Sequence, residues 1–477
     1  MKKIIFINTF LFLIFMQVFA NNIRGGLPFF FNYHPNDYSG FSQNWSATIN
    51  SKGFLFVANG DGVLMYNGSV WEKFLITNNV TPSSLLCDEN DVIWVGAQSE
   101  LGCLIPDRKQ GYRYVSLINL VNPKYRNFNF IYSIKKTKNN IYFLTSENVF
   151  CLQSDKISRI PVDKSSHLFY KNKNLFIYEP LKGFSQVVDD KLIKIPDNFA
   201  DIKTHIITSV IDLGGDSAIV VDKDSGIKKI KLDFSYYNKV NIIIKDLNLK
   251  IDTLLINSDV YTALRLHNGN YAFATQRNGT FITDSAFNIL YNLSREVGVL
   301  NESHNFLLED NQNNLWIMMD NGICKVNSQL PLSGFNDFQG VKGSVLDVNR
   351  FAGRLFIATW QGVFYENVGI QKNIFLPIDN IVKQSWDIEK VKLNDENYLL
   401  IATSGGIYLI DEQLNSKLIL SGRGLLVKPI PEDNRFVYVM SEDSIKLLDF
   451  SENIFKPKVT VLPNLDKRNT SAKLTKD

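Results

Sequence analysis

Cysteine and histidine are both scarce in this chain of 477 residues, which contains four cysteines and five histidines. The cysteines are far apart and lie in apolar stretches, which predicts buried thiols rather than disulfides. The histidines stand singly, without the paired spacing that a metal site requires. We therefore expect neither a metal nor a cofactor.

An excess of basic charge is also missing, because 51 Lys and Arg residues face 48 Asp and Glu residues. A nucleic-acid surface needs clustered cations to displace counterions, so we expect no nucleic-acid partner. The sequence also lacks a phosphate-binding loop and a Gly-x-Ser-x-Gly nucleophile turn. A carboxylate pair for glycoside cleavage could still form between distant residues, but no spacing favours one. We expect the chain not to be an enzyme.

Long apolar runs are missing everywhere except at the N-terminus. Lys2 and Lys3 precede an apolar run at 4–15, and Ala20 ends a small-residue cleavage motif. The run is short for a bilayer core of about 30 Å, so we interpret residues 1–20 as a cleaved signal peptide. This predicts export and a periplasmic location. Any membrane anchor would lie in segments downstream of this chain.

What the sequence does contain is a repeat rich in aromatic residues, which make up 12% of the chain. A polar turn with Gly, Asn or Asp leads to an apolar strand, and a second turn, often with Gly, leads to another strand. The clearest copies are residues 53–66, 314–326, 353–365 and 397–409. Ten units recur every 35–55 residues or so, which is the spacing of propeller blades of four strands each. The predicted fold class is an all-β propeller.

The order of the repeats predicts two rings, because propellers usually close with four to eight blades. A Leu-Pro pair and an aromatic-rich strand occur near residue 26 and again near residue 330. We interpret each as an outer strand that opens a ring, the first of which completes a seventh blade. The predicted domains are a seven-bladed propeller at 26–330 and a partial second propeller of about three blades at 331–477. One ring of ten blades is the alternative.

The C-terminal residues 471–477 resemble an inner strand that stops before its partner. An inner strand without its neighbour leaves backbone groups unpaired. We therefore expect the chain to be part of a longer protein.

These repeats resemble those of regulator propellers in bacterial two-component sensors. The similarity lies in 91–96 and 314–323, with their Trp and Gly, and in an opening segment with Gly26, Pro28 and Tyr33. It covers nearly all of the chain after residue 20. The resemblance implies two propellers that sense an extracytoplasmic ligand, often a glycan. It also implies a β-sandwich, a membrane helix and an output domain, none of which this sequence contains.

Propeller topology predicts a binding face, because the loops entering the inner strands and the turns between second and third strands share one side. Tryptophans on a wet rim suit stacking on sugar rings. An alternative interpretation is that these aromatics plug the axis or pack between blades. The candidate ligand-binding residues are Trp45, Trp386, Trp360, Tyr261, His304 and Asn59.

The sequence therefore favours a non-catalytic periplasmic sensor region with a glycan or small-molecule ligand, in which like chains could pair as a dimer. An exported scaffold or adhesion propeller that binds another protein is one alternative. A propeller lyase or glycosidase is another.

Overall fold

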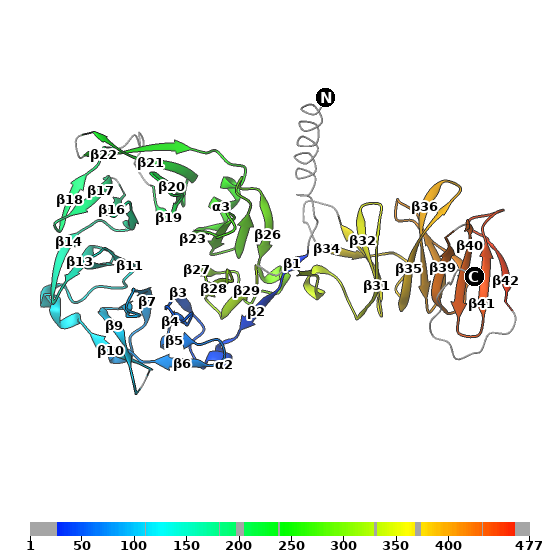
Figure 1. The fold of residues 1–477 in the computed structure, drawn as a ribbon, viewed down its shortest axis with the longest axis horizontal. Helices are drawn as coiled ribbons and strands as arrows, with labels where there is room; N and C mark the ends of the chain where they lie inside the picture. The colour runs from blue at the N-terminus through cyan, green and yellow to red at the C-terminus, as the bar shows by residue number, and fades with distance from the viewer. Residues whose placement is uncertain are drawn as a thin grey trace, which may run out of the picture. The chain divides into compact units, whose positions relative to one another are not determined.

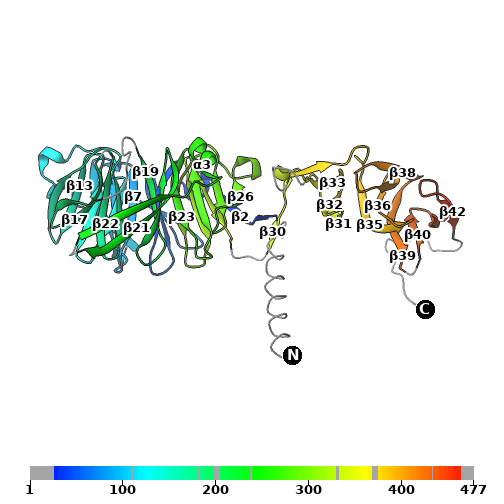
Figure 2. The ribbon, with the colours of Figure 1, turned by 90° about the horizontal axis from the view of Figure 1, so that it is seen from above.

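The computed structural model describes residues 26–462, except 110, 181, 197–204, 237–238, 329–331, 368–373 and 432. The predicted signal peptide (1–20) and the predicted last strand (471–477) lie outside this range. The chain forms two compact units, one of residues 28–333 and one that contains the residues from 334 onward. Figure 1 shows the first unit as a ring of blades, and Figure 2 shows that ring edge-on.

The first unit contains seven four-stranded antiparallel sheets. In six of them the strands follow one another from the axis outward. The strands of these six blades are β3 (Asn44–Ile49), β4 (Leu55–Asn59), β5 (Gly62–Tyr66) and β6 (Trp71–Phe74); β7 (Pro82–Cys87), β8 (Ile93–Ala97), β9 (Glu100–Asp107) and β10 (Gly111–Ser116); β11 (Ser133–Lys136), β12 (Asn140–Leu144), β13 (Asn148–Gln153) and β14 (Lys156–Pro161); β15 (His167–Lys171), β16 (Asn174–Glu179), β17 (Gly183–Val188) and β18 (Lys191–Lys194); β19 (Ile207–Asp212), β20 (Ser217–Asp222), β21 (Gly226–Tyr236) and β22 (Lys239–Asp246); β23 (Val260–Arg265), β24 (Tyr271–Thr275), β25 (Thr280–Thr283) and β26 (Ile289–Leu293).

The seventh blade joins the two ends of the ring. It consists of β27 (His304–Glu309), β28 (Leu315–Met319), β29 (Ile323–Val326) and, on the outside, β2 (Phe30–Tyr33). Tyr33 pairs with Ile323 in antiparallel register, so the N-terminal strand completes the last blade as predicted. The inner strand β27 also contacts β3 of the first blade. The ring therefore closes after seven blades, which excludes a single ring of ten.

The second unit contains three further blades. Their strands are β31 (Val345–Phe351), β32 (Arg354–Thr359), β33 (Gly362–Asn367) and β34 (Ile374–Pro377); β35 (Ser385–Leu393), β36 (Glu396–Thr403), β37 (Gly406–Ile410) and β38 (Ser416–Ser421); β39 (Gly424–Ile430), β40 (Asp433–Ser441), β41 (Ile445–Asp449) and β42 (Lys458–Val461). The predicted opening strand near residue 330 differs from expectation. Among the described residues of this segment, the strand that forms is β30 (Ser333–Gly334), and it pairs with β1 (Leu27–Pro28) in a two-stranded sheet of its own instead of joining a blade.

Helical segments are short and lie in the connections. They are α2 (Pro35–Tyr38), α3 (Asp252–Ser258), and the 3₁₀ turns Thr77–Asn79, Ile118–Leu120, Pro123–Tyr125, Arg295–Val297 and Asp337–Gln339. The blades themselves are specified locally. In the turn after the inner strand, the Asp88 carboxylate accepts the backbone N–H of Val92 and the indole N–H of Trp94, both at 3.1 Å. Asp310 does the same for Asn314 and Trp316. This explains the Asp…Trp spacing of the repeat.

Neighbouring blades are joined through their inner strands, whose inner edges have no further strand to pair with. Hydroxyl groups of one blade accept backbone N–H groups of the next in the first ring. Ser46 accepts from Leu85 at 3.2 Å, and Ser209 accepts from Ala263 at 2.8 Å. In the second unit carboxylates take this place, because Asp347 accepts from Ile388 and Asp387 accepts from Val427. The fold class predicted from the sequence is confirmed, and its blade count agrees with the sheets observed.

Candidate functional site

A β-bulge near the start of the inner strand recurs in eight blades and determines which side chains reach the rim. A bulge inserts one extra residue and redirects its side chain. Three of the predicted site residues, Trp45, Tyr261 and Trp386, occupy this inserted position. The other bulged residues are Ser83, Thr208, Asn305, Leu346 and Leu425.

The aromatics of the first ring are of two kinds, although Trp45 and Tyr261 both occupy the bulged position. Trp45 is partly buried and packs on the cluster of Phe56 and Leu85 between the first two blades. Tyr261 is 45% exposed, and Tyr132, which precedes β11, is 56% exposed. Burial raises the pKa of Tyr261, and electrostatic interactions with Tyr132 and Asp320 raise it further. Tyr261 and Tyr132 therefore remain exposed, whereas Trp45 is mainly a packing residue.

His304 is one residue removed from the position predicted for it. The bulged residue of its strand is Asn305, so the His304 side chain points inward and is fully buried. Its Nε2–H donates to the carbonyl oxygen of Asn301 at 2.9 Å, and Nδ1 accepts from the Thr280 hydroxyl at 2.7 Å. Burial lowers its pKa to about 4, so the ring is neutral at pH 7. This histidine holds the loop in place and is closed off from ligands.

Asn59 is also fully buried, although it lies at the turn where the sequence placed it. Its amide oxygen accepts the backbone N–H of Phe41 at 2.9 Å, and its NH₂ group donates to the carbonyl of Phe41 and to the side chain of Asn44. Phe41 belongs to the segment that leads into β3, and Asn44 is the first residue of that strand. Asn59 thus anchors this loop and presents no free polar atom at the rim.

Several loops at one end of the strands of the second unit expose apolar and basic side chains, and we call this end its rim. Trp360 is 58% exposed and Val382 is 73% exposed. Gly362 packs so closely on the next loop that an added Cβ would lie 3.4 Å from the Cα atom of Val382, which puts the two loops side by side. The guanidinium carbon of Arg423 lies 5.0 Å from the ring centre of Trp386. Arg423 also pairs with Glu442 at 3.3 Å.

The six predicted residues are divided between the two units. Trp45, Asn59, Tyr261 and His304 belong to the first ring, and Trp360 and Trp386 belong to the second unit. The sequence prediction omitted Tyr132, Val382 and Arg423. Tyr132 could have been found, because Ile131-Tyr132-Ser133 repeats the pattern of Val260-Tyr261-Thr262.

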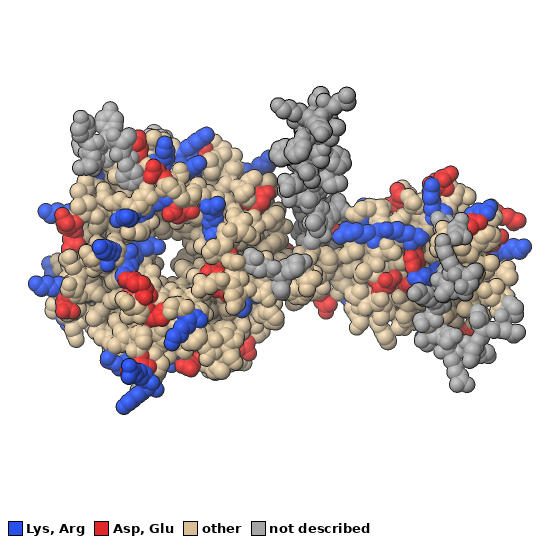
Figure 3. Space-filling model, in the orientation of Figure 1, with Lys and Arg blue, Asp and Glu red and all other residues tan. Residues whose placement is uncertain are grey.

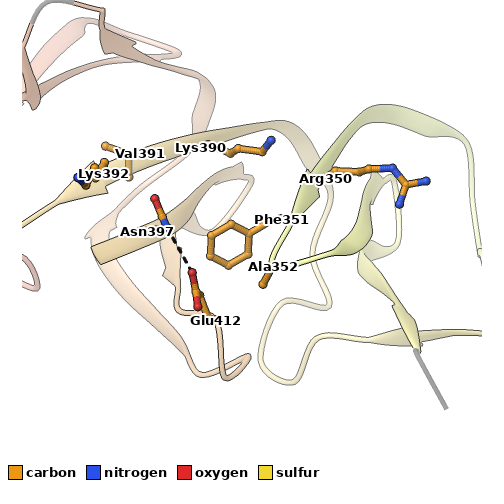
Figure 4. A pocket seen from close by; sticks show the side chains of 8 residues that line it. All are labelled: Arg350, Phe351, Ala352, Lys390, Val391, Lys392, Asn397 and Glu412. Carbon is orange, nitrogen blue, oxygen red and sulfur yellow. Dashed lines mark hydrogen bonds between the residues drawn. The ribbon is translucent and has the colours of Figure 1, made fainter. Parts of the chain in front are cut away.

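A cavity of about 380 Å³ lies between the inner strands β31 and β35 of the second unit, at the strand ends away from the rim (Figure 4). Figure 4 shows the Phe351 ring between Arg350 and Lys390 on one side and the hydrogen-bonded pair of Asn397 and Glu412 on the other. None of the predicted residues lines this cavity. It is lined by Arg350, Phe351, Ala352, Lys390, Val391, Lys392, Asn397 and Glu412.

No cluster of three or more potential metal ligands occurs among the residues that the structure describes. Within the same residues, no helix combines the length and apolar character needed to span a bilayer. The four cysteines are free thiols, and three of them are buried.

Comparison with known proteins supports the fold. No known protein-family model matches the chain. No curated protein matches it either. Among solved structures, the chain resembles a domain described as the extracellular domain of the hybrid two-component system BT3049 of B. thetaiotaomicron, with a TM-score of 0.62 and 15% identity. The match covers 93% of this chain and 61% of that one, so this chain spans less than two thirds of that domain.

Two further solved structures are more distant. The extracellular domain of BT4673, described as a one-component system of the same organism, has a TM-score of 0.48 and 13% identity over 91% of this chain and 67% of that chain. A streptogramin B lyase has a TM-score of 0.47 and 14% identity over 63% of this chain and 97% of the lyase. These two scores are too low to support an argument. The first match confirms the predicted resemblance to regulator-propeller sensor modules at the level of the fold.

Proposed function

We propose that this chain is the non-catalytic, ligand-recognising region of a periplasmic bacterial signal-transduction regulator. The main support is the similarity to the BT3049 extracellular domain, which covers 93% of the chain and therefore both units. The predicted signal peptide and periplasmic location belong to the same proposal.

The proposed recognition surface is the rim of the second unit. A sugar ring has an apolar face that stacks on indole and hydroxyl groups that bind polar neighbours. Trp360 offers an exposed indole, and Trp386 offers one whose ring already lies beside the Arg423 guanidinium. Aromatic surface beside a hydrogen-bond donor suits a saccharide better than it suits a purely apolar ligand. We therefore propose a glycan as the ligand class.

The decisive experiment is a thermal-shift screen of the purified chain against a panel of oligosaccharides. A ligand present at about one hundred times its dissociation constant should stabilise the fold by about 2.7 kcal/mol. Trp360→Ala and Trp386→Ala should each abolish the shift. Phe455→Ala should retain it, because Phe455 is an exposed aromatic residue of the same unit, in the turn between β41 and β42 at the other strand ends.

Two results would contradict the proposal. Shifts that survive in both tryptophan variants would remove the rim as the recognition surface. If chromatography detected cleavage products of an oligosaccharide incubated with the chain, the chain would be an enzyme.

A further inference from the structure

The long hairpin of β21 and β22 in the fifth blade has two faces of opposite character. One face, which includes Ile230, Leu232 and Ile242, packs on buried aromatic residues of the fourth blade. On this packed face Lys228 and Asp246 lie directly opposite each other in the strand register and form an ion pair, so their charges are matched. Side chains alternate along a strand, so the residues between these point to the other face.

The other face carries Lys229 and Lys231 from β21 and Ile243 and Lys245 from β22, and we call these four residues the lysine face. Lys229 lies directly opposite Lys245, and Lys231 lies directly opposite Ile243. All four side chains are exposed, Ile243 to 49%. Figure 3 shows basic side chains over the part of the ring that β21 and β22 form.

The charges of the lysine face are not compensated by the residues that the structure describes. Within those residues, none of the three ammonium groups forms an ion pair or a hydrogen bond. Asp233 points to the same face, two residues beyond Lys231, and forms no ion pair with these lysines. Like charges directly opposite each other in antiparallel strands are destabilising. The hairpin thus has a matched charge pair on its packed face and a mismatched pair, Lys229 and Lys245, on its exposed face.

Protection of a sheet edge explains only part of this pattern. The strand β22 is the outermost strand of its sheet, and lysine on such a strand discourages pairing with another sheet. This reason applies to Lys245 but not to Lys229 and Lys231, because β21 lies inside the sheet between β20 and β22. It also leaves the exposed Ile243 unexplained, since an apolar side chain at an edge favours association rather than preventing it.

We propose that the lysine face binds an acidic segment of another protein in extended conformation. An extended chain presents alternate side chains about 7 Å apart, which is also the spacing of Lys229 and Lys231 along β21. Acidic residues at alternate positions of the segment pair with these lysines, and an apolar residue of the segment contacts Ile243.

A protein segment fits this face better than a bilayer does. Surfaces that lie on a bilayer insert several apolar side chains between their cations, whereas the lysine face has one, Ile243. The lysine face belongs to the first ring and is separate from the tryptophan rim of the second unit, so this inference goes beyond the proposed glycan recognition.

The test is fluorescence anisotropy with the purified chain at low ionic strength and two labelled peptides. The acidic peptide alternates glutamate with threonine and has a valine in place of its central glutamate, and the neutral peptide has glutamine at every glutamate position. The acidic peptide should bind the parent chain about tenfold or more tightly than the neutral one. Because each exposed ion pair contributes up to a factor of about five, the triple variant Lys229→Gln, Lys231→Gln and Lys245→Gln should lose about tenfold or more in affinity for it.

The matched control is the triple variant Lys109→Gln, Lys138→Gln and Lys156→Gln. Its lysines are exposed elsewhere on the first ring, and its net charge changes equally. It should bind the acidic peptide like the parent.

The single variant Lys245→Glu separates binding from stability. It places opposite charges across the two strands, as Lys228 and Asp246 are placed on the packed face. It should therefore melt at or above the temperature of the parent, while it binds the acidic peptide more weakly than the parent does.

The proposal is overturned if both peptides bind the parent alike, or if the two triple variants lose affinity to the same extent. Self-association of the lysine-face variant in light scattering, with unchanged peptide affinity, would instead assign the lysines to protection of β22. Sedimentation of the chain with phosphatidylglycerol vesicles through the same lysines, without peptide binding, would replace the protein partner by a membrane surface. Trp360→Ala and Trp386→Ala should bind the acidic peptide like the parent, so the outcome at the lysine face is separable from the outcome at the rim.

Discussion

Closure of the first ring depends on the N-terminal strand β2, and Tyr33 is the residue on which to test it. The Tyr33 ring lies 5.6 Å from Tyr66, 5.5 Å from Trp71 and 5.9 Å from Trp316, measured between ring centres. Trp316 belongs to the seventh blade, and Tyr66 and Trp71 belong to the first. Tyr33 thus joins β2 to both ends of the ring.

Tyr33→Ala removes all three aromatic pairs and half-buried ring surface. Each pair contributes about 0.5–1.5 kcal/mol beyond burial, and large-to-small changes at aromatic sites cost about 3–5 kcal/mol when fully buried. Since Tyr33 is only partly buried, we expect a loss of about 3 kcal/mol from the free energy that keeps β2 paired. Opening of this strand should then become more frequent by about a hundredfold.

Hydrogen exchange measured by mass spectrometry on the peptide that contains β2 checks this directly. Phe31→Ala is the control, because Phe31 is on the same strand but is 58% exposed. Its exchange should remain close to that of the parent. The reasoning is refuted if the two variants exchange alike at β2, or if Tyr33→Ala accelerates exchange equally in every blade. Either result would mean that the aromatic contacts do not hold the seam.

The remaining predictions concern buried polar groups. His304 has a pKa of about 4 in the fold, below its unfolded value near 6.5, so acid favours the unfolded chain, which takes up a proton that the buried ring does not. Lowering the pH from 7 to 5 should reduce the free energy of unfolding by about 2 kcal/mol through this residue. Melting curves of His304→Gln across this range should lack that contribution. The same pH dependence in the parent and in the variant would contradict the assignment. In the second unit, Asp387→Ala leaves the Val427 N–H without its acceptor and should destabilise by about 1–3 kcal/mol in urea unfolding, whereas Asp387→Asn keeps an acceptor oxygen and should cost less. Equal losses in the two Asp387 variants would show that charge, rather than the hydrogen bond, is what matters.

Much of the fold could be predicted from the sequence because the blade is a local structure. Asp310 and Trp316 are six residues apart, and their hydrogen bond fixes the turn between two adjacent strands. Such turns, with apolar strands between them, repeat along the chain and specify sheets without reference to distant residues. The restart near residue 26 was also visible, because β2 completes a blade that otherwise lacks its outer strand.

The candidate site was less accessible to sequence reasoning, because exposure depends on one extra residue per strand. His304 and Asn305 are adjacent, and only the observed bulge shows that Asn305, not His304, occupies the position of Tyr261. Trp45 occupies that position too, yet it packs between blades while Tyr261 remains exposed. Sequence type alone therefore does not separate a ligand-stacking aromatic from a packing one.

The sequence by itself determined that this chain forms four-stranded blades, because turn chemistry and strand patterning act over a few residues. Only the tertiary structure decided where the ring closes and which polar side chains meet across blades, because both depend on contacts between distant residues. Lys136 illustrates this division. The sequence places a lysine on an inner strand, but only the ring brings the Asp88 carboxylate of the preceding blade within 3.3 Å of its ammonium group.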